Sequence, residues 1–128
     1  MKKYTFFFAL LFCILMISCE DFFEKNLKKE SITLLSPING DTISTNAVNF
    51  WWEIIEAKDV RYNIQIVENT FSAPVQLILD SNISDNIFDF NLTNGKYEWR
   101  VRGINNSSET EYVTRSLFVD GNADLTNE

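Results

Sequence analysis

Apolar and polar residues alternate with period two along several short stretches of the chain. In the clearest stretch, apolar or aromatic residues at positions 97, 99 and 101 alternate with charged residues at positions 98, 100 and 102. Successive side chains of a β-strand point to opposite faces of its sheet, so this pattern predicts a strand with one buried and one wet face. The preceding Asn94-Gly95 is a turn signal, because both residues tolerate positive φ.

Comparable patterns elsewhere predict six further strands and no helix. The seven predicted strands cover residues 32–35, 47–53, 60–68, 76–79, 87–92, 97–102 and 112–119. Their parity places Trp52, Tyr97 and Trp99 in the core. Short strands at regular spacing without helical periodicity predict an all-β sandwich of two antiparallel sheets.

Leu92, a turn and then Tyr97 at the start of a strand resemble the tyrosine corner of fibronectin type III and related immunoglobulin-like domains. In that corner the Tyr hydroxyl bonds back to upstream backbone. Leu35 to Gly40 and Tyr97 to Arg102 also look like the bacterial version of this module. The resemblance covers Ser31 to Val119 and implies a seven-stranded antiparallel β-sandwich. The paired cysteines of a true immunoglobulin domain are absent.

The chain begins with a short basic start and an apolar run from Tyr4 to Ile17. This run is short for a spanning helix of about 20 residues, and it is typical of a secretory leader. Leu15 to Cys19 resembles the lipobox of bacterial lipoproteins. The resemblance implies that residues 1–18 are cleaved off and that Cys19 carries the acyl chains, palmitate among them. A secreted protein with an unmodified Cys19 is the alternative.

Glu20-Asp21 and the nearby Glu24 resemble the acidic export signal of Bacteroidetes surface lipoproteins. This implies lipid anchoring in the outer membrane with display at the cell surface, and a periplasm-facing position stays open. Residues 19–30 are predicted to be the lipidated Cys and an acidic tether, whose last eleven residues reach at most ~35–40 Å. The domain then occupies residues 31–119, and residues 120–128 are predicted to be a disordered polar tail.

The charge balance and the absence of histidine exclude several functions. Without Lys2 and Lys3 of the leader, nine basic residues remain against 18 acidic ones. Such a chain repels phosphate backbones, so nucleic acid is not expected as a partner. The chain has no His, the commonest general base and metal ligand. We therefore predict no enzyme activity, no cofactor and no metal.

A carboxylate-rich segment is the remaining candidate for chemistry. Asp80, Asp85 and Asp89 cluster in sequence, but they fall in and beside a loop, where Asp serves turns. A calcium ion among Asp80, Asn82 and Asp85 is an alternative, although the spacing lacks the glycine and distal Glu of a calcium loop.

Adjacent tryptophans on one predicted strand must point to opposite faces. If Trp52 is in the core, Trp51 lies on the outer face of the first sheet. An exposed Trp can stack on a sugar ring or dock a partner. The alternative is that Phe22 and Phe23 of the tether fold over it.

All four arginines fall on predicted strands that share the second sheet. Alternation puts Arg61, Arg100 and Arg102 on its outer face, whereas the direction of Arg115 is ambiguous. The outward Arg side chains either pair with Glu residues as ordinary cross-strand charges or form a guanidinium-rich patch for an acidic partner. Glu68 and Glu98 are the predicted Glu partners.

Asp41-Thr42-Ile43 resembles the O-glycosylation motif of Bacteroidetes exported proteins, so Thr42 is a candidate modification site. There are also four Asn-X-Ser/Thr sequons, and the bacterial leader argues against their modification. They begin at Asn82, Asn91, Asn105 and Asn106.

Taken with the resemblances, these features predict a non-catalytic cell-surface lipoprotein. Its single fibronectin type III-like domain would act as a binding or spacer module, with the membrane reached through lipid on Cys19 and an unknown protein as partner. The alternative is a carbohydrate-binding accessory lipoprotein of a glycan-uptake system, with the glycan on Trp51.

Overall fold

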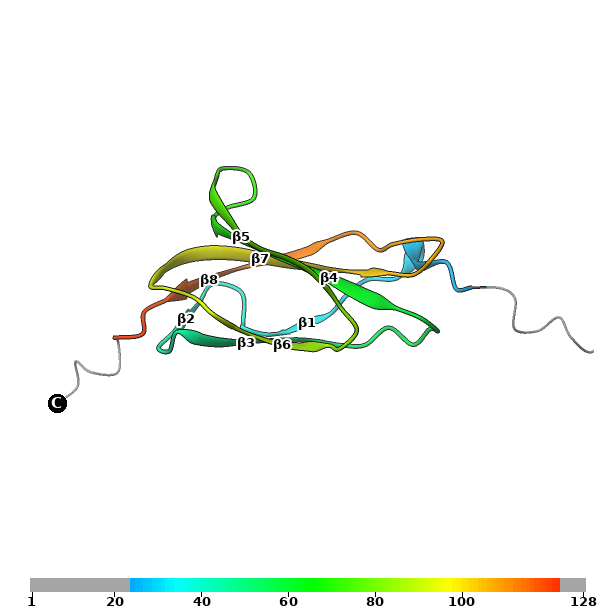
Figure 1. The fold of residues 1–128 in the computed structure, drawn as a ribbon, viewed down its shortest axis with the longest axis horizontal. Helices are drawn as coiled ribbons and strands as arrows, with labels where there is room; N and C mark the ends of the chain where they lie inside the picture. Colours follow the sequence, from blue (N-terminus) through cyan, green and yellow to red (C-terminus); the bar gives the residue numbers. More distant parts are fainter. Residues whose placement is uncertain (1–23, 123–128) are drawn as a thin grey trace, which may run out of the picture.

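The computed structural model describes residues 24–122, which form two β-sheets packed face to face (Figure 1). The elements are the 3-10 helix η1 (Leu27–Lys29) and the strands β1 (Leu34–Ser36), β2 (Asp41–Ile43), β3 (Ala47–Trp52), β4 (Arg61–Asn69), β5 (Pro74–Ile83), β6 (Ile87–Asn91), β7 (Gly95–Ile104) and β8 (Val113–Val119). The leader and Cys19 lie outside the described residues. Within residues 24–122, no helix is long and apolar enough to cross a membrane.

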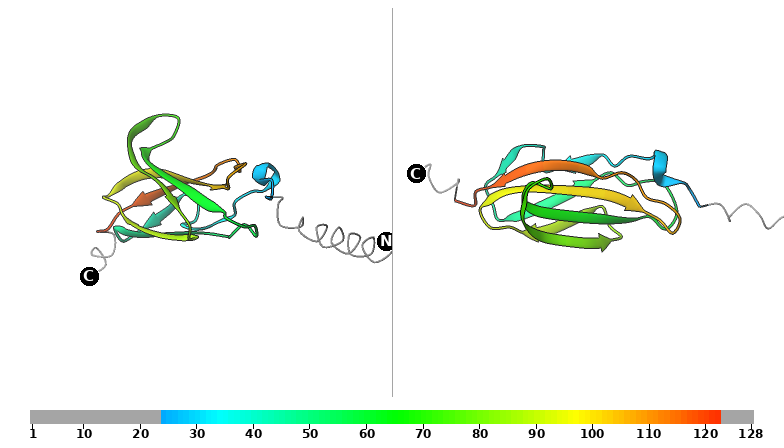
Figure 2. Two further views of the ribbon diagram at one scale, coloured as in Figure 1. Left: turned by 45° about the vertical axis from the view of Figure 1, so that its right-hand side comes forward. Right: turned by 90° about the horizontal axis from the view of Figure 1, so that it is seen from above.

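One sheet has three strands in the order β1-β3-β6, and the other has five in the order β2-β8-β7-β4-β5. Neighbouring strands are antiparallel, apart from β2 and β8, which are parallel. Figure 2 shows the same fold turned by 45° and seen from above. Two packed sheets agree with the predicted sandwich, but the parallel β2–β8 pair departs from the prediction that all strands are antiparallel.

The predicted number of seven strands is wrong, because the described residues contain eight. The additional strand is β2, in a region that the sequence assigns to a turn and its exit. Gly40, with a φ of +78°, reverses the chain, and its N–H donates to the carbonyl of Ser116 (2.8 Å). Asp41 to Ile43 then pair with Leu117 to Val119. Three residues with a single apolar member give no alternation, so the sequence pattern misses this strand.

The edge strand β5 also differs from the prediction, which gave only residues 76–79. It has ten residues, and most of its N-terminal half is exposed. An edge strand that buries neither face fully shows little alternation, so its length is poorly marked in the sequence.

The core lies between the sheets and is built by the inward parity of β3, β4 and β7. Trp52, Tyr97 and Trp99 are buried, with exposed fractions of 0%, 2% and 0%, so their predicted facing is confirmed. The ring of Trp99 contacts that of Phe50 edge-to-face, with centroids 4.9 Å apart. Trp52 meets Tyr62 in the same way at 5.6 Å. Such edge-to-face pairs add about 0.5–1.5 kcal/mol beyond burial.

The tyrosine corner forms as the resemblance implies. The hydroxyl of Tyr97 donates to the backbone carbonyl of Thr93 (2.9 Å), and the Thr93 side chain lies 3.0 Å from the same hydroxyl. Leu92 beside the corner is buried. The corner therefore fixes how the chain leaves the three-stranded sheet and enters β7.

The end of the segment assigned to the tether is packed on the domain. Leu27 of η1 is fully buried, with an exposed fraction of 0%, and it belongs to the core cluster. Ile32, shortly after it, is also buried. Residues 24–30 are therefore part of the folded unit, which begins before Ser31.

Candidate binding surfaces

The arginines of the five-stranded sheet lie where strand parity puts them, with Arg61, Arg100 and Arg102 on the outer face. In the β4–β7 register, Arg100 pairs with Gln65 and Arg102 with Asn63. Arg61 is exposed at the start of β4. It borders a shallow surface hollow of about 540 Å³ that Asp59, Val60, Ser84 and Asn106 also line.

Arg115 points the other way and serves the structure. Its Nη1 donates to the carbonyl of Pro37 (2.9 Å) and its Nη2 to the carbonyl of Leu34 (2.6 Å). The side chain thereby ties β8 of one sheet to β1 of the other. The sequence left the direction of this side chain ambiguous. In the structure Arg115 links the two sheets and does not belong to the outer face.

Two aromatic rings and two guanidinium groups are stacked on the outer face, and we call this stack the arginine ladder. The Cζ of Arg100 lies 4.0 Å from the ring centroid of Phe71 and 4.1 Å from that of Tyr112. The Cζ of Arg102 lies 4.6 Å from the ring centroid of Tyr112. Nη1 of Arg102 also pairs with Oε1 of Glu109 (2.8 Å). The order along the ladder is therefore Phe71, Arg100, Tyr112 and Arg102.

Phe71 reaches the ladder because the β4–β5 hairpin bends out of the sheet. The register between β4 and β5 shifts after Ile66 and again after Glu68, and Asn69 adopts a positive φ of 74°. In Figure 1 the hairpin rises above the five-stranded sheet. The N–H of Phe71 donates to Oε2 of Glu98 (2.8 Å), which fixes the loop over β7.

A chain of side-chain hydrogen bonds supports the ladder from β4 and β5. Nε of Arg100 donates to Oε1 of Gln65 (2.8 Å), and Nε2 of Gln65 donates to Oδ2 of Asp80 (3.0 Å). Nδ2 of Asn63 donates to Oδ1 of Asp80 (2.8 Å), while its Oδ1 accepts from the hydroxyl of Tyr112. Connected bonds of this kind hold their members in one arrangement.

Asn63 faces outward as predicted, yet only 6% of it is exposed. Tyr112 covers it, together with side chains of β5. The same crowding raises the pKa of Tyr112, because burial disfavours the charged phenolate; nearby Arg102 and Arg100 oppose this increase.

Neither predicted reading of the arginines describes their contacts fully. The carboxylate partner of Arg102 is Glu109, a loop residue, and Glu98 binds the backbone of Phe71. The sequence pattern did not predict that Arg100 stacks on aromatic rings. Phe71 carried no signal because it lies in a loop, outside any strand parity.

Trp51 is on the outer face of the three-stranded sheet, as its parity predicts, with 44% exposed against 0% for Trp52. Its partner across the β3–β6 register is Ile87, which is 49% exposed. Two positions along β3, Nδ2 of Asn49 donates to Oδ1 of Asp89 (2.7 Å). The proposed cover of Phe22 and Phe23 lies outside the described residues.

The carboxylate-rich segment is used within the fold. Asp80 accepts from Asn63 and Gln65, and Asp89 accepts from Asn49. The side-chain oxygen of Asn82 accepts from Asn63 (2.9 Å). Within residues 24–122, no group of three His, Cys, Asp or Glu side chains is placed to hold a metal ion.

The candidate modification sites differ in access. Thr42 is exposed on β2, and its N–H donates to Oδ1 of Asp41 (2.9 Å). Asn82, Asn91 and Asn106 are exposed. Asn105 is only 5% exposed, so its side chain is engaged in packing the loop after β7.

No family model matches the sequence, and the search of curated proteins gives no significant match. Among solved structures, the chain is similar to the extracellular region of rat CD45, domains d3–d4, with a TM-score of 0.47 and 14% identity, covering 78% of this chain and 70% of that one. It is also similar to the fibronectin type III domain of human fibronectin type III domain containing protein 3, with a TM-score of 0.41 and 18% identity, covering 75% and 92%.

Proposed function

We propose that this chain is a non-catalytic binding module of a cell-surface lipoprotein, and that it binds an acidic protein segment through the arginine ladder. The observation that carries the proposal is the stacking of Arg100 between two rings, at 4.0 and 4.1 Å. A guanidinium held in this way loses little freedom when its edge bonds a carboxylate. Stacking on a ring uses the face of the group and leaves in-plane donors for a ligand.

The position of the ladder supports a role in recognition. It lies on the outer face of the larger sheet, in a chain that is otherwise strongly acidic. Like charge disfavours most acidic partners elsewhere on the surface, so the ladder is where an acidic segment meets least repulsion. Gln65 accepts from Nε of Arg100, and no residue within 24–122 accepts from its two Nη atoms, so these can donate to a ligand.

Site-specific photo-crosslinking in the source cell tests this proposal. A photoreactive amino acid at Thr114, which is exposed and pairs with Arg100 in the β7–β8 register, should capture a discrete partner. Arg100→Ser should abolish this product. The same probe at Asn49 on the other sheet is the control and should give no such product. A product that forms equally at Asn49, or that survives Arg100→Ser, contradicts the ladder as the binding surface.

The lipoprotein part of the proposal rests on the leader and on Cys19. Lipid on Cys19 would anchor the chain stably, since several acyl chains hold a protein on a bilayer where one does not. The acidic residues after Cys19 support the outer membrane as the site. Detergent-phase partitioning and the mass of the mature N-terminus test this part, with Cys19→Ala expected to leave the detergent phase or to remain uncleaved.

A second candidate function is carbohydrate binding at Trp51. It is favoured by an open indole beside a hydrogen-bonded amide and carboxylate, Asn49 and Asp89. Sugar rings stack on aromatic faces while their hydroxyls bond to such polar groups. On a glycan array, Trp51→Ala should then abolish binding. Phe118→Ala is the matched control, because Phe118 is similarly exposed (46%) but lies on the other sheet.

A further inference from the structure

The first described residues of the chain are bound to the loop between β7 and β8. The N–H of Asn106 donates to Oε1 of Glu24 (2.9 Å), and Nδ2 of Asn105 donates to the carbonyl of Lys25 (2.7 Å). The N–H of Leu27 donates to Oγ of Ser108 (2.8 Å). We call residues 24–30, bound in this way, the N-terminal clasp.

Internal hydrogen bonds order both the clasp and the β7–β8 loop that it contacts. Oδ1 of Asn105 accepts from the N–H (2.8 Å) and the Oγ (3.0 Å) of Ser108, which orients its Nδ2 toward Lys25. Within the segment, Oδ1 of Asn26 caps η1 by accepting from the N–H of Lys28 (3.0 Å). Since Leu27 is also fully buried, residues 24–30 are fixed on the domain. Only the residues before Glu24 then connect the domain to Cys19.

The clasp shortens the connection to Cys19. From Cys19 to Glu24 there are five peptide steps, which span at most ~18 Å. Without the clasp, the free chain would run to Glu30 and reach about twice as far. A headgroup layer is about 5–8 Å thick, so a connection of this length keeps the domain close to the membrane surface.

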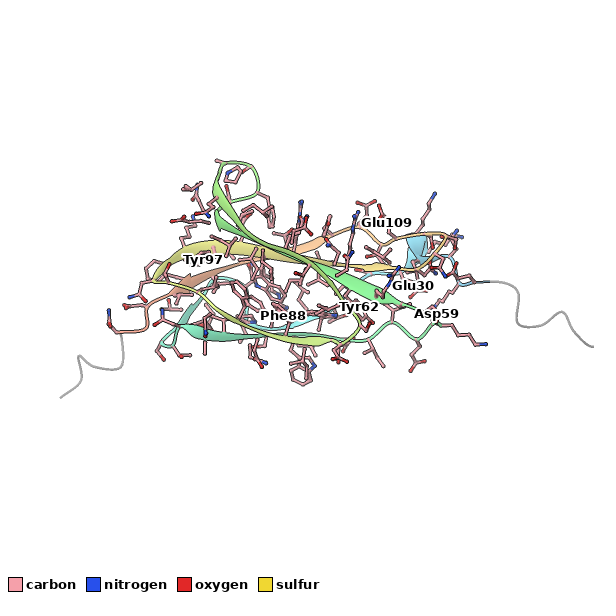
Figure 3. All side chains as sticks on the ribbon, in the orientation of Figure 1. Glu30, Asp59, Tyr62, Phe88, Tyr97 and Glu109 are labelled. Carbon is pink, nitrogen blue, oxygen red and sulfur yellow. The ribbon has the colours of Figure 1, made fainter. Side chains whose placement is uncertain are left out.

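We propose that the clasp holds the η1 end of the sandwich against the headgroup layer of the bilayer that anchors Cys19. This inference rests on the proposed lipidation of Cys19. The η1 end comprises the clasp, the β3–β4 loop and the β7–β8 loop; Figure 3 shows Glu30, Asp59 and Glu109 together there, with Tyr97 toward the opposite end. Ile54 of the β3–β4 loop is 62% exposed at this end.

The charges at the η1 end are mixed, so the contact is set by the short connection and not by electrostatic attraction. The basic residues of these segments are Lys25, Lys28, Lys29 and Lys58, and the acidic ones are Glu24, Glu30, Glu53, Glu56, Asp59, Glu109 and Glu111. Salt should therefore leave the contact in place. With this end on the membrane, the arginine ladder faces sideways and stays open to a partner.

Single-cysteine labelling tests this orientation. The sequence has two Cys, and Cys13 lies in the leader, so a fluorophore on a newly introduced Cys is unique in the lipidated mature protein. Ile54→Cys reports the η1 end. Ser44→Cys, in the exposed β2–β3 turn, reports the opposite end. In phosphatidylethanolamine–phosphatidylglycerol vesicles with a nitroxide-headgroup lipid, we expect several-fold stronger quenching at position 54 than at position 44, at low and at high salt.

Two changes to the connection complete the test. Ten Gly/Ser residues inserted between Phe23 and Glu24 keep the clasp but lengthen its link, so quenching at position 54 should fall to the level at position 44. The same insertion after Asn122 should change nothing. Equal quenching at both positions in the unmodified chain, or a difference that survives the first insertion, overturns the inference. A mature N-terminus without lipid overturns the proposed anchor as well, and mass spectrometry separates these outcomes.

Discussion

The outer faces of the two sheets differ in how their polar groups are used. On the five-stranded sheet, Arg100 and Tyr112 stack, and Asn63 beneath them is only 6% exposed. On the three-stranded sheet, Trp51 and Ile87 lie open, with exposed fractions of 44% and 49%. The outer face of the five-stranded sheet thus holds its polar side chains in one connected arrangement, whereas the outer face of the three-stranded sheet exposes an apolar pair. A side chain that points outward from a strand can therefore be nearly buried in a polar network, like Asn63, or open to solvent, like Trp51.

The largest expected effect contrasts the two sides of β3. Trp52→Ala should lower the free energy of unfolding by about 3–5 kcal/mol, since it empties a buried aromatic site, a large share of the ~5–15 kcal/mol of a small domain. Trp51→Ala should change it by less than about 0.5 kcal/mol, as is usual for surface substitutions. Urea unfolding of the mature chain measures both. Equal midpoints for the two variants would refute the facing of this strand.

A smaller effect compares the amides of the two outer faces. Asn63→Ala should cost about 1–3 kcal/mol, because it leaves buried partners without their hydrogen bonds. Asn49→Ala removes an exposed bond to Asp89 and should cost no more than about 0.5 kcal/mol. The same unfolding experiment applies. If both variants lose equally little, the network beneath the ladder does not stabilise the fold.

A third effect concerns the stacking of the ladder itself. Arg100→Lys keeps the charge but loses the planar group and the bond to Gln65, so we expect a loss of about 0.5–2 kcal/mol. Arg61→Lys, at an exposed position off the ladder, is the matched control and should be neutral. Thermal unfolding distinguishes the two. A neutral Arg100→Lys would mean that the ring contacts are incidental.

The smallest effect is a dependence on alkaline pH. The raised pKa of Tyr112 means that the unfolded chain releases this proton before the folded chain does. The resulting stability is present below the unfolded pKa of about 10 and is lost as pH rises through the folded pKa. Tyr112→Phe should therefore show a shallower loss of stability above pH 10 than the parent. Parallel curves for the two proteins would count against a buried Tyr112 hydroxyl.

Much of the fold follows from parity in the sequence, and the ladder does not. The strands β3 and β7 were predictable because each buries one face, so residues such as Trp52 and Trp99 alternate with more exposed ones. In β4 the apolar Tyr62, Ile64 and Ile66 alternate with polar residues in the sequence, although Asn63 on the outer face is buried as well. The strand β2 was missed because it is formed by pairing with β8, far along the chain, and it has little pattern of its own.

The missed parts of the candidate surfaces also depend on distant contacts. Phe71 reaches Arg100 only through the bend of the β4–β5 hairpin. Leu27 is one apolar residue in a charged segment, and its burial depends on bonds to a loop about 80 positions later. A single Leu among charged residues gives no periodic pattern, so the sequence did not predict that Leu27 packs into the core.

Nuclear magnetic resonance titration of the arginine side chains tests the central claim most directly. With a glutamate-rich peptide as the probe, we expect the Nε–Hε signals of Arg100 and Arg102 to shift progressively, while the indole N–H signal of Trp51 stays in place. Arg100→Ser should remove the response of Arg102 as well, because the two flank the same ring. Arginine signals that do not move at millimolar peptide, or shifts confined to Trp51 and its neighbours on β3 and β6, would contradict the ladder as the binding surface.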